Sequence, residues 1–534
     1  MPTARVALRL CAIATGLLLG MGLGLMVSSG NFGATFMTFV VGAMALAARL
    51  APPSQRTRLL IMLGIAFALR VACAATLDAW VAFENRPDLG VVGDDGAYAR
   101  LSWAAVEYIH GKNVLPNGPP YWYGEEYLFG TYVYLEMGLL FLFGHNILVV
   151  DLMNVGFAIV MIGLLFDTTR HLFGDRAAWT TGAVVSFYPS LVVWSSINLK
   201  DSLALLLLAA TLCVLVRFAQ RPRWIWLVVL VAMLLPMETL RRYLFIALAI
   251  VLPVAVWVAP RLTARARLLS GVSITLVCAT LVSLDYNSTL LLRPSTFASI
   301  EIIREAQTLN ANSAFVANPP LKVHEGDTFV VPGPQTGNTV VAEPGSRVVV
   351  EAPSSSAQPS RPGVVVARPG DLVVFGKPDT TPQPLDLRHT LAAPDGGVQS
   401  RPADNDTVGR NVGYLPQGLT YVVLAPFPWA LRRIADAATI PEMLAWYVLQ
   451  IAAVATLWRE RRRWRELVPF VIYAGGMYVV LALFEGNVGT LFRHRAMLIP
   501  TVIVLGAPSL VLLWPRLRGQ VALGTLAFDR VRSR

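Results

Sequence analysis

The sequence predicts an all-α polytopic membrane protein of about 12–13 transmembrane helices, with a small β-rich extracytoplasmic insert. Of its 534 residues, 55% are hydrophobic and only 14% are charged, whereas a soluble domain carries about a quarter charged residues. The mean hydropathy is +0.57. The charges lie between long apolar runs, each near the ~20 residues that cross a bilayer as a helix.

The apolar runs give the candidate spans and their boundaries. These are 7–27, 33–49, 58–79, 127–144, 147–167, 177–194, 202–218, 224–239, 243–259, 268–286, 440–458, 466–484 and 496–514. We therefore expect an N-terminal transmembrane hairpin over 1–57, a transmembrane module over 58–310 with its first external loop at 80–126, an insert over 311–415, and a C-terminal module with a basic cytoplasmic tail over 416–534. The hairpin begins with a basic, apolar stretch like that of a signal peptide, but a second apolar run follows at once, so we expect it to stay uncleaved.

Lys and Arg in short loops predict the orientation. The basic loops 50–58, 219–223, 260–267 and 459–465 and the tail after Arg516 are expected in the cytoplasm. That places 80–126, 287–417 and the turn 485–495 outside. One conflict arises, because counting spans puts 167–176 outside while its charge puts it inside. We therefore expect one span between 120 and 200 to be broken or re-entrant.

The insert carries three turn-plus-strand units, at 325–331, 344–350 and 369–375. A turn residue pair precedes a β-branched run in each, which favours strands, and 352–363 resembles a linker. Such an insert can bind glycan, but a variable decoration without a binding role is the better interpretation.

Composition also excludes some classes of function. The formal charge of +11 sits largely in inter-helix loops, where it sets orientation and attracts headgroups, so no nucleic acid partner is expected. Cys11, Cys73, Cys213 and Cys278 all lie in apolar runs without metal-ligand spacing, so we interpret them as packing residues.

The strongest candidate for catalysis is the pair Asp94–Asp95 in the first external loop. Two adjacent carboxylates can bind a divalent cation such as Mg²⁺ or Mn²⁺, or one can serve as a general base that the other tunes. The alternative is that one of them caps a helix over 96–110. Both roles are compatible.

Several cations are predicted on the same external side. Arg70 lies inside a span near its external end, where it needs a partner such as a lipid phosphate or else extends to the interface. In the polar break after the sixth span, Lys200 either meets a phosphate or is neutralised by Asp201. Cation-rich turns on a face that is normally basic-poor favour a bound anion, and their residues are Arg241, Arg242, Asn487, Arg493, His494 and Arg495.

These features together resemble the GT-C superfamily of membrane glycosyltransferases, of the glycosyltransferase family 39 type. The shared features are the Arg70 helix, the Asp94–Asp95 loop with the helix that follows it, and the run from Phe187 to Ser202. Relatives include the protein O-mannosyltransferases and the lipid A aminoarabinose transferase. The stretches 424–429, 442–447 and 487–495 resemble a bacterial subgroup. The segment 317–405 departs from the family, as do the two helices that precede its usual first one.

The resemblance implies an enzyme of the bacterial inner (plasma) membrane, multi-pass with its large loops extracytoplasmic. It would transfer a sugar from a polyprenyl-phosphate donor to a cell-envelope glycan, lipid or protein acceptor. One acid of the pair would act as the base, with a metal ion in some members. Two alternatives stay open. One is an O-antigen polymerase or ligase using polyprenyl-diphosphate glycan, which would depend on Arg241, Arg242, Arg493 and His494. The other is a transporter, although no internal repeat supports it.

Overall fold

The computed structural model describes residues 33–83, 91, 94–112, 130–284, 407–427, 439–485 and 488–512, and six short strands between 321 and 375. The predicted span 7–27, the linker 352–363, Asn487 and the tail after Arg516 lie outside the described residues. The chain forms two compact units. The first comprises 1–289, 438–480 and 493–534, and the second comprises 290–437 and 481–492.

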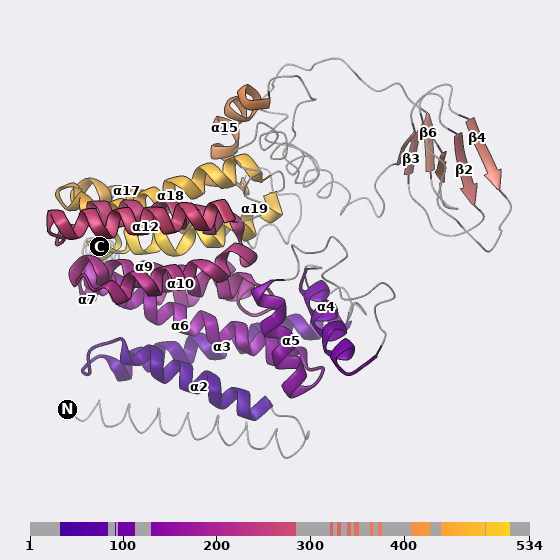
Figure 1. The fold of residues 1–534 in the computed structure, drawn as a ribbon. Coiled ribbons are helices and arrows are strands. Elements are labelled where there is room, and N and C mark those ends of the chain that lie inside the picture. The colour runs from indigo at the N-terminus through magenta and orange to yellow at the C-terminus, as the bar shows by residue number, and fades with distance from the viewer. Residues whose placement is uncertain are drawn as a thin grey trace, which may run out of the picture. The chain divides into compact units, whose positions relative to one another are not determined.

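Helices dominate the first unit, where they run alongside one another (Figure 1). The described helices are α2 (Gly33–Arg49), α3 (Arg56–Phe83), α4 (Asp94–Ile109), α5 (Thr131–Phe143), α6 (Ile147–Phe173), α7 (Asp175–Phe187), α8 (Pro189–Trp194), α9 (Asp201–Gln220), α10 (Trp224–Leu240), α11 (Arg242–Val258), α12 (Ala264–Leu284), α15 (Thr407–Leu424), α17 (Ile440–Arg459), α18 (Trp464–Phe484) and α19 (Val488–His494), with 3₁₀ turns η3 (Arg461–Arg463) and η4 (Arg495–Met497).

Six of these helices are long and apolar enough to cross a membrane, namely α3, α6, α9, α12, α17 and α18. A seventh span results if the pair Val488–Met497 and Ile499–Leu512, bent by 63°, is one span. Shorter apolar helices include α5, α10 and α11. The all-α polytopic class is confirmed. Over the part of the chain that the structure describes, fewer helices have full spanning length than the sequence predicts.

Helices α6 and α9 run parallel to each other. Near their starts, Asn154 donates to the carbonyl of Ile197 over 2.8 Å, and near their ends Arg217 pairs with Asp167 at 2.6 Å. The intervening chain must therefore cross back. It does so as α7 and α8, which are separated at Tyr188, and Pro189 begins α8. The predicted span 177–194 is thus a broken one.

The prediction of a span over 127–144 is wrong. Helix α5 has 13 residues, or about 20 Å, against about 30 Å for a hydrocarbon core. Thr131 at its start contacts Thr239 at the end of α10, and α6 begins three residues after its C-cap, Gly144. Because α10 ends and α6 begins at the same end of the unit, α5 does not cross. This removes the conflict over 167–176.

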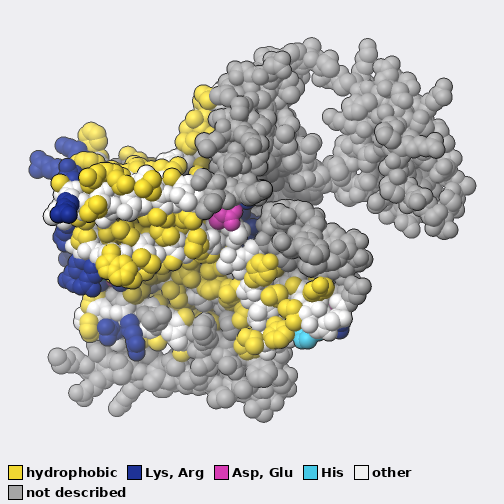
Figure 2. Space-filling view, viewed as in Figure 1, with side chains coloured by type: hydrophobic (Ala, Val, Ile, Leu, Met, Phe, Trp, Pro, Cys, Tyr) yellow, Lys and Arg dark blue, Asp and Glu magenta, His cyan; other side chains and the backbone are white. Residues whose placement is uncertain are grey.

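Basic side chains gather at one end of the first unit, which we call the basic end. It comprises the helix termini and turns at 49–56, 170–176, 217–223, 259–267 and 459–466. Contacts join these segments, as when Arg463 donates to the carbonyl of Leu172 over 2.9 Å. Figure 2 shows dark-blue side chains at this end, yellow side chains along the helices, and an acidic patch toward the other end. The basic segments that the sequence assigns to the cytoplasm therefore share one end.

Close helix packing in this unit depends on small residues. A Cβ at Gly163 of α6 would lie 2.8 Å from the Cβ of Ala47 in α2, whereas one at Gly156 would meet only Val40, at 3.7 Å. The first distance is shorter than a van der Waals contact. Gly163 therefore sets how closely α2 and α6 approach.

The second unit contains six strands, β1 (Leu321–Val323), β2 (Thr328–Pro332), β3 (Thr339–Ala342), β4 (Arg347–Glu351), β5 (Val364–Val366) and β6 (Leu372–Phe375). They form two parallel three-stranded sheets, ordered β1-β3-β6 and β4-β2-β5. The three sequence units contribute β2, β4 and β6. An autonomous, extracytoplasmic β-rich insert stays a prediction.

Candidate active site

The acidic pair lies in the first turn of α4, at the end of the first unit opposite the basic end. There, carboxylates are favoured by the helix dipole. Their environments differ. Asp94 keeps 51% of its side chain exposed, whereas Asp95 is buried and accepts a hydrogen bond from the backbone N–H of Val91 over 2.6 Å. Asp94 is thus available to a substrate, and Asp95 fixes the chain that leads into the helix.

Arg493 connects Asp94 to a second carboxylate. Its Nη1 donates to Asp94 Oδ2 over 2.6 Å, and its Nε donates to Asp201 Oδ2 over 2.7 Å. Asp94 and Arg493 are 399 positions apart in the sequence. The end of α19 therefore lies against the starts of α4 and α9.

Asp201, the first residue of α9, is buried between two guanidinium groups. Arg241 donates to its Oδ1 from Nε over 2.9 Å and also from Nη2, while Arg241 Nη1 lies 2.9 Å from His494 Nε2. Burial lowers the pKa of Arg241, but the charge of Asp201 outweighs it and raises the pKa above its ordinary value. We call Asp94, Asp201, Arg241, Arg493 and His494 the acid–arginine cluster.

Two cationic groups beside this cluster have unused donors. Arg493 Nη2 is buried and has no hydrogen-bond partner within the described ranges. The Lys200 ammonium group lies 5.8 Å from the ring centroid of Tyr98, and no hydrogen bond or ion pair joins that group to another described residue. Burial and then Arg241 lower the pKa of Lys200 to about 8. Three cations thus face two carboxylates, and the unused donors fit an anion.

A buried hydrogen-bond network lies next to the acid–arginine cluster and holds the helices that carry it. Asn198 accepts from the Tyr132 hydroxyl over 2.6 Å, and its Nδ2 donates to Glu136 over 2.7 Å and to the Asp95 carbonyl over 3.3 Å. Asn154 of α6 donates to the same Tyr132 hydroxyl over 2.8 Å. The network joins α4, α5 and α6 to the polar break before α9. It fixes the acidic turn relative to Asp201.

The structure does not bring Arg70 to this cluster, which corrects its assignment to phosphate binding. Arg70 is fully buried and donates to Ser195 over 2.9 Å and to the carbonyls of Ser186 and Val185 over 2.9 and 3.4 Å. Pro189 has no N–H for the Val185 carbonyl, and the Ser190 N–H donates to Glu442 over 2.9 Å. Arg70 therefore satisfies carbonyls that the break between α7 and α8 leaves without helix partners.

Two other predicted residues also lie apart from the cluster. Arg242, the first residue of α11, pairs with Glu238 in the last turn of α10 at 3.3 Å. Arg495 is buried, with its guanidinium 5.4 Å from the Trp446 ring centroid and 3.1 Å from Met443 Sδ. The cluster therefore takes Arg241, Arg493 and His494 from the predicted set. Asn487 lies outside the described residues.

Metal binding at the acidic pair finds no further ligands in the described parts of the chain. No group of three or more His, Cys, Asp or Glu side chains there could hold a metal ion. Asp94 has the Arg493 guanidinium as its counter-ion. The described residues thus offer too few ligands to argue for Mg²⁺ or Mn²⁺, so metal binding stays a prediction and no step below depends on it.

Part of the chain, including some residues of this site, is similar to a known protein family. Residues 132–283 match the sequence model of the dolichyl-phosphate-mannose-protein mannosyltransferase family. The resemblance to the GT-C membrane glycosyltransferases is confirmed. The GT-C match begins in α5 and runs to α12, so it includes Lys200, Asp201 and Arg241 but not Asp94 or Arg493. A search of curated proteins found no match.

Asp201 is the residue of the cluster that the sequence assigns to another role. The sequence offers it only as one possible counter-ion of Lys200, its neighbour in the chain, whereas in the structure Arg241 and Arg493 form ion pairs with it. Its position at the start of a helix after a polar break is the signal that points to a site.

Proposed function

We propose that this membrane glycosyltransferase moves a sugar from a polyprenyl-phosphate donor to an acceptor hydroxyl of an extracytoplasmic cell-envelope glycan, lipid or protein. The observation that carries the proposal is the acid–arginine cluster beside two unused cationic donors. An exposed carboxylate and a phosphate-binding group then lie within one site. Transfer from a lipid-linked phosphate needs both.

Asp94 takes the role of the general base. It is the exposed acid of the pair, whereas Asp95 is buried and holds Val91. The acceptor oxygen attacks the anomeric carbon while its proton passes to Asp94. The bond from that carbon to the phosphate oxygen breaks, and its electron pair leaves with the polyprenyl phosphate. A single displacement of this kind inverts the anomeric centre.

Arg493 and Lys200 take the role of stabilising the departing phosphate. Among the described residues, Arg493 Nη2 has no hydrogen-bond partner, while Nη1 donates to Asp94 and Nε donates to Asp201. The same guanidinium thus orients the base and faces the phosphate. Asp201 keeps Arg493 and Arg241 in place by pairing with both. Fixed donors of this kind are effective because they need no reorganisation during the reaction.

The polymerase or ligase alternative has support from the same cluster, because Arg241, Arg493 and His494 belong to it. Mutating those residues alone no longer separates the two functions, since they contact the residues that hold Asp94. The two functions must instead be distinguished by the sugar donor that the enzyme accepts. One function uses a monophosphate-linked sugar and the other a diphosphate-linked glycan.

The test is transfer by the purified protein in proteoliposomes, with polyprenyl-monophosphate sugars and polyprenyl-diphosphate oligosaccharides supplied separately. We expect product and free polyprenyl phosphate with a monophosphate donor only. Product from the diphosphate donor alone would establish the alternative. Movement of lipid-linked sugar across the bilayer without any product would establish a transporter.

A further inference from the structure

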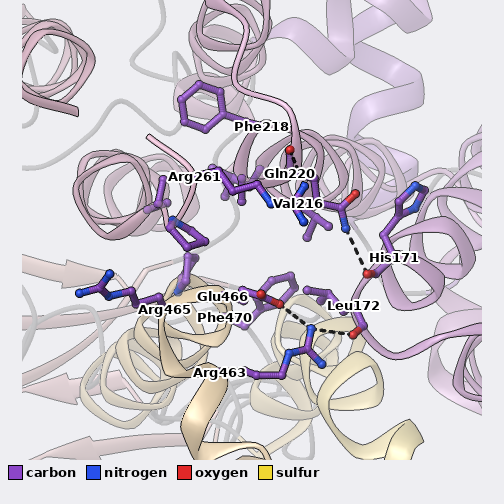
Figure 3. A pocket seen from close by; sticks show the side chains of 16 residues that line it. His171, Leu172, Val216, Phe218, Gln220, Arg261, Arg463, Arg465, Glu466 and Phe470 are labelled. Atoms are coloured by element: carbon purple, nitrogen blue, oxygen red, sulfur yellow. Dashed lines mark hydrogen bonds and ion pairs between the residues drawn. The ribbon is translucent and has the colours of Figure 1, made fainter. Parts of the chain in front are cut away.

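A cavity of about 140 Å³ opens at the basic end, far from the residues of the acid–arginine cluster along α9 and α11. The ends of α6, α9 and α11 and the start of α18 form its walls (Figure 3). Its polar lining consists of His171, Gln220, Arg261, Arg463, Arg465 and Glu466. None of the proposed catalytic groups belongs to it.

The charges around this cavity do not cancel. Arg463 forms an ion pair with Glu466 and a longer one with Glu460 at 3.7 Å, and His171 pairs with Asp167 at 3.2 Å. Each acid at the cavity therefore already has a basic partner. The remaining arginines, Arg261 and Arg465, therefore give the cavity lining a net positive charge.

Neither of these two arginines forms an ion pair with any residue in the described ranges. Arg261 donates to the neutral carbonyl of Gln220 over 2.8 Å, and Arg465 lies 5.5 Å from the ring centroid of Trp464. Figure 3 shows Arg465 extending away from the other labelled side chains. Two uncompensated guanidinium groups favour a bound anion, and their planar donors suit a phosphate in particular.

The inner part of the cavity is apolar. Leu215, Val216, Ala255 and Phe470 line it. Leu215 and Val216 lie about one helical turn before Gln220 in α9, and Phe470 lies about one turn after Glu466 in α18, so these apolar residues are further from the basic end. A cationic mouth above an apolar floor matches an amphiphile. A free phosphate ion would make no favourable contact with the apolar residues.

We propose that this cavity binds the phosphate headgroup of an anionic phospholipid from the leaflet at the basic end. The phosphate binds at the cationic opening, where Arg261 lies and toward which the Arg465 side chain turns on binding, and the glycerol and first acyl carbons lie against Val216 and Phe470. Such a lipid neutralises the mouth and joins α6, α9, α11 and α18. This site is independent of the proposed transferase activity.

The experiment is native mass spectrometry of the delipidated protein, titrated separately with phosphatidylglycerol, phosphatidylcholine and inorganic phosphate. The test variant is Arg261→Gln/Arg465→Gln, and the matched control is Arg265→Gln/Arg462→Gln, which removes two exposed arginines at the same end that do not line the cavity. Ala219→Leu, which narrows the cavity without changing charge, is the third variant.

We expect phosphatidylglycerol to bind the wild type and the control, with at least a tenfold loss in the test variant and in Ala219→Leu. Phosphatidylcholine should bind more weakly. Equal losses in test and control variants would mean general surface attraction and would overturn the site. Binding of inorganic phosphate as tight as that of the lipid would show a soluble-anion site and would overturn the lipid assignment.

Discussion

Two arginines, Arg70 and Arg493, show how the same side chain takes different roles in this fold. Arg70 donates to a hydroxyl and three backbone carbonyls in a buried site. Arg493 donates to two carboxylates, and its Nη2 has no hydrogen-bond partner in the part of the chain that the structure describes. The first arrangement completes a broken helix, and the second leaves a donor for a ligand.

Substitution by lysine should separate these roles. Arg493→Lys loses the planar donor set, so we expect the donor KM to rise roughly 5- to 150-fold, equivalent to about 1–3 kcal/mol. Arg70→Lys should leave donor KM nearly unchanged but lower the free energy of unfolding by about 1–3 kcal/mol, because buried carbonyls lose their donors. Steady-state kinetics and thermal unfolding of both variants provide the measurement.

Arg265→Lys serves as the control, because Arg265 is exposed at the basic end and belongs to neither of these two sites. It should change neither quantity. A donor KM that rises in Arg70→Lys and stays constant in Arg493→Lys would reverse the assignment.

Lys200 should make donor binding depend on pH. Its pKa of about 8 lies below the ordinary value of 10.5, so the ammonium is charged below pH 8 and loses its proton as the pH rises through that value. An anionic donor binds the charged form better, and the donor KM should rise above pH 8 by up to about tenfold per unit. The measurement is donor KM from pH 6.5 to 9.5.

Lys200→Arg keeps its charge over this range and should give a flat profile, whereas Lys200→Met should bind weakly at every pH. The assignment fails if Lys200→Arg retains the wild-type pH dependence, since another group would then be titrating.

At the scale of elements, close approach between helices depends on single glycines. Gly163 and Gly156 lie on the same helix, and replacing either by alanine brings the same gain in helix propensity. The Cβ added at Gly163 would lie 2.8 Å from Ala47, against 3.7 Å from Val40 at Gly156. The difference between the two variants thus isolates the contact of α2 with α6.

We expect Gly163→Ala to lower the free energy of unfolding by about 1–3 kcal/mol through overpacking. Gly156→Ala should be neutral or slightly stabilising. Thermal unfolding in one detergent gives the comparison. Equal midpoints for both variants would show that α2 adjusts without cost.

The elements also show how far the sequence determines the fold. Long apolar runs predict α3, α6, α9, α12, α17 and α18 because a bilayer demands length and composition alone. Helix α5 is misassigned because its apolar residues suit a short helix at the membrane surface as well as a span, and hydropathy does not distinguish them. Pro189 predicts the break in 177–194. The hydrogen bonds from Arg70 to the carbonyls at this break depend on helix packing, so the sequence does not predict them.

The candidate site is predictable to a similar degree. Placing the turns after 80, 195, 241 and 485 on one side predicts that acids and cations meet there. The sequence does not predict which arginine pairs with which acid, because the pairing depends on distances between helices. The pairing of Asp201 with two arginines and the hydrogen bonds of Asn198 are therefore seen only in the structure.

At the scale of the whole molecule, the two ends of the first unit differ in charge and in proposed role. Because α5 does not cross, Arg176 lies at the same end as the arginines of η3. The positive-inside rule predicts that this end lies in the cytoplasm. On that prediction, the acid–arginine cluster faces the other side of the membrane.

Labelling of single cysteines tests this arrangement. In a variant lacking the native cysteines, Arg176→Cys and Arg462→Cys should resist a membrane-impermeant maleimide in intact cells and react after permeabilisation. Lys112→Cys, at an exposed position just after α4, should react in intact cells. Reaction at 176 with protection at 462 would mean that α5 crosses the membrane after all.

The central claim is that Asp94 is the base of a transferase that uses a polyprenyl-phosphate sugar. Its most direct test is the rate of sugar transfer by purified Asp94→Asn, with Glu107→Gln in the same helix as the matched control. Removing a general base should lower kcat by about 10²–10⁴-fold, with thermal stability preserved and the control at the wild-type rate. Transfer by Asp94→Asn at the wild-type rate would contradict the claim.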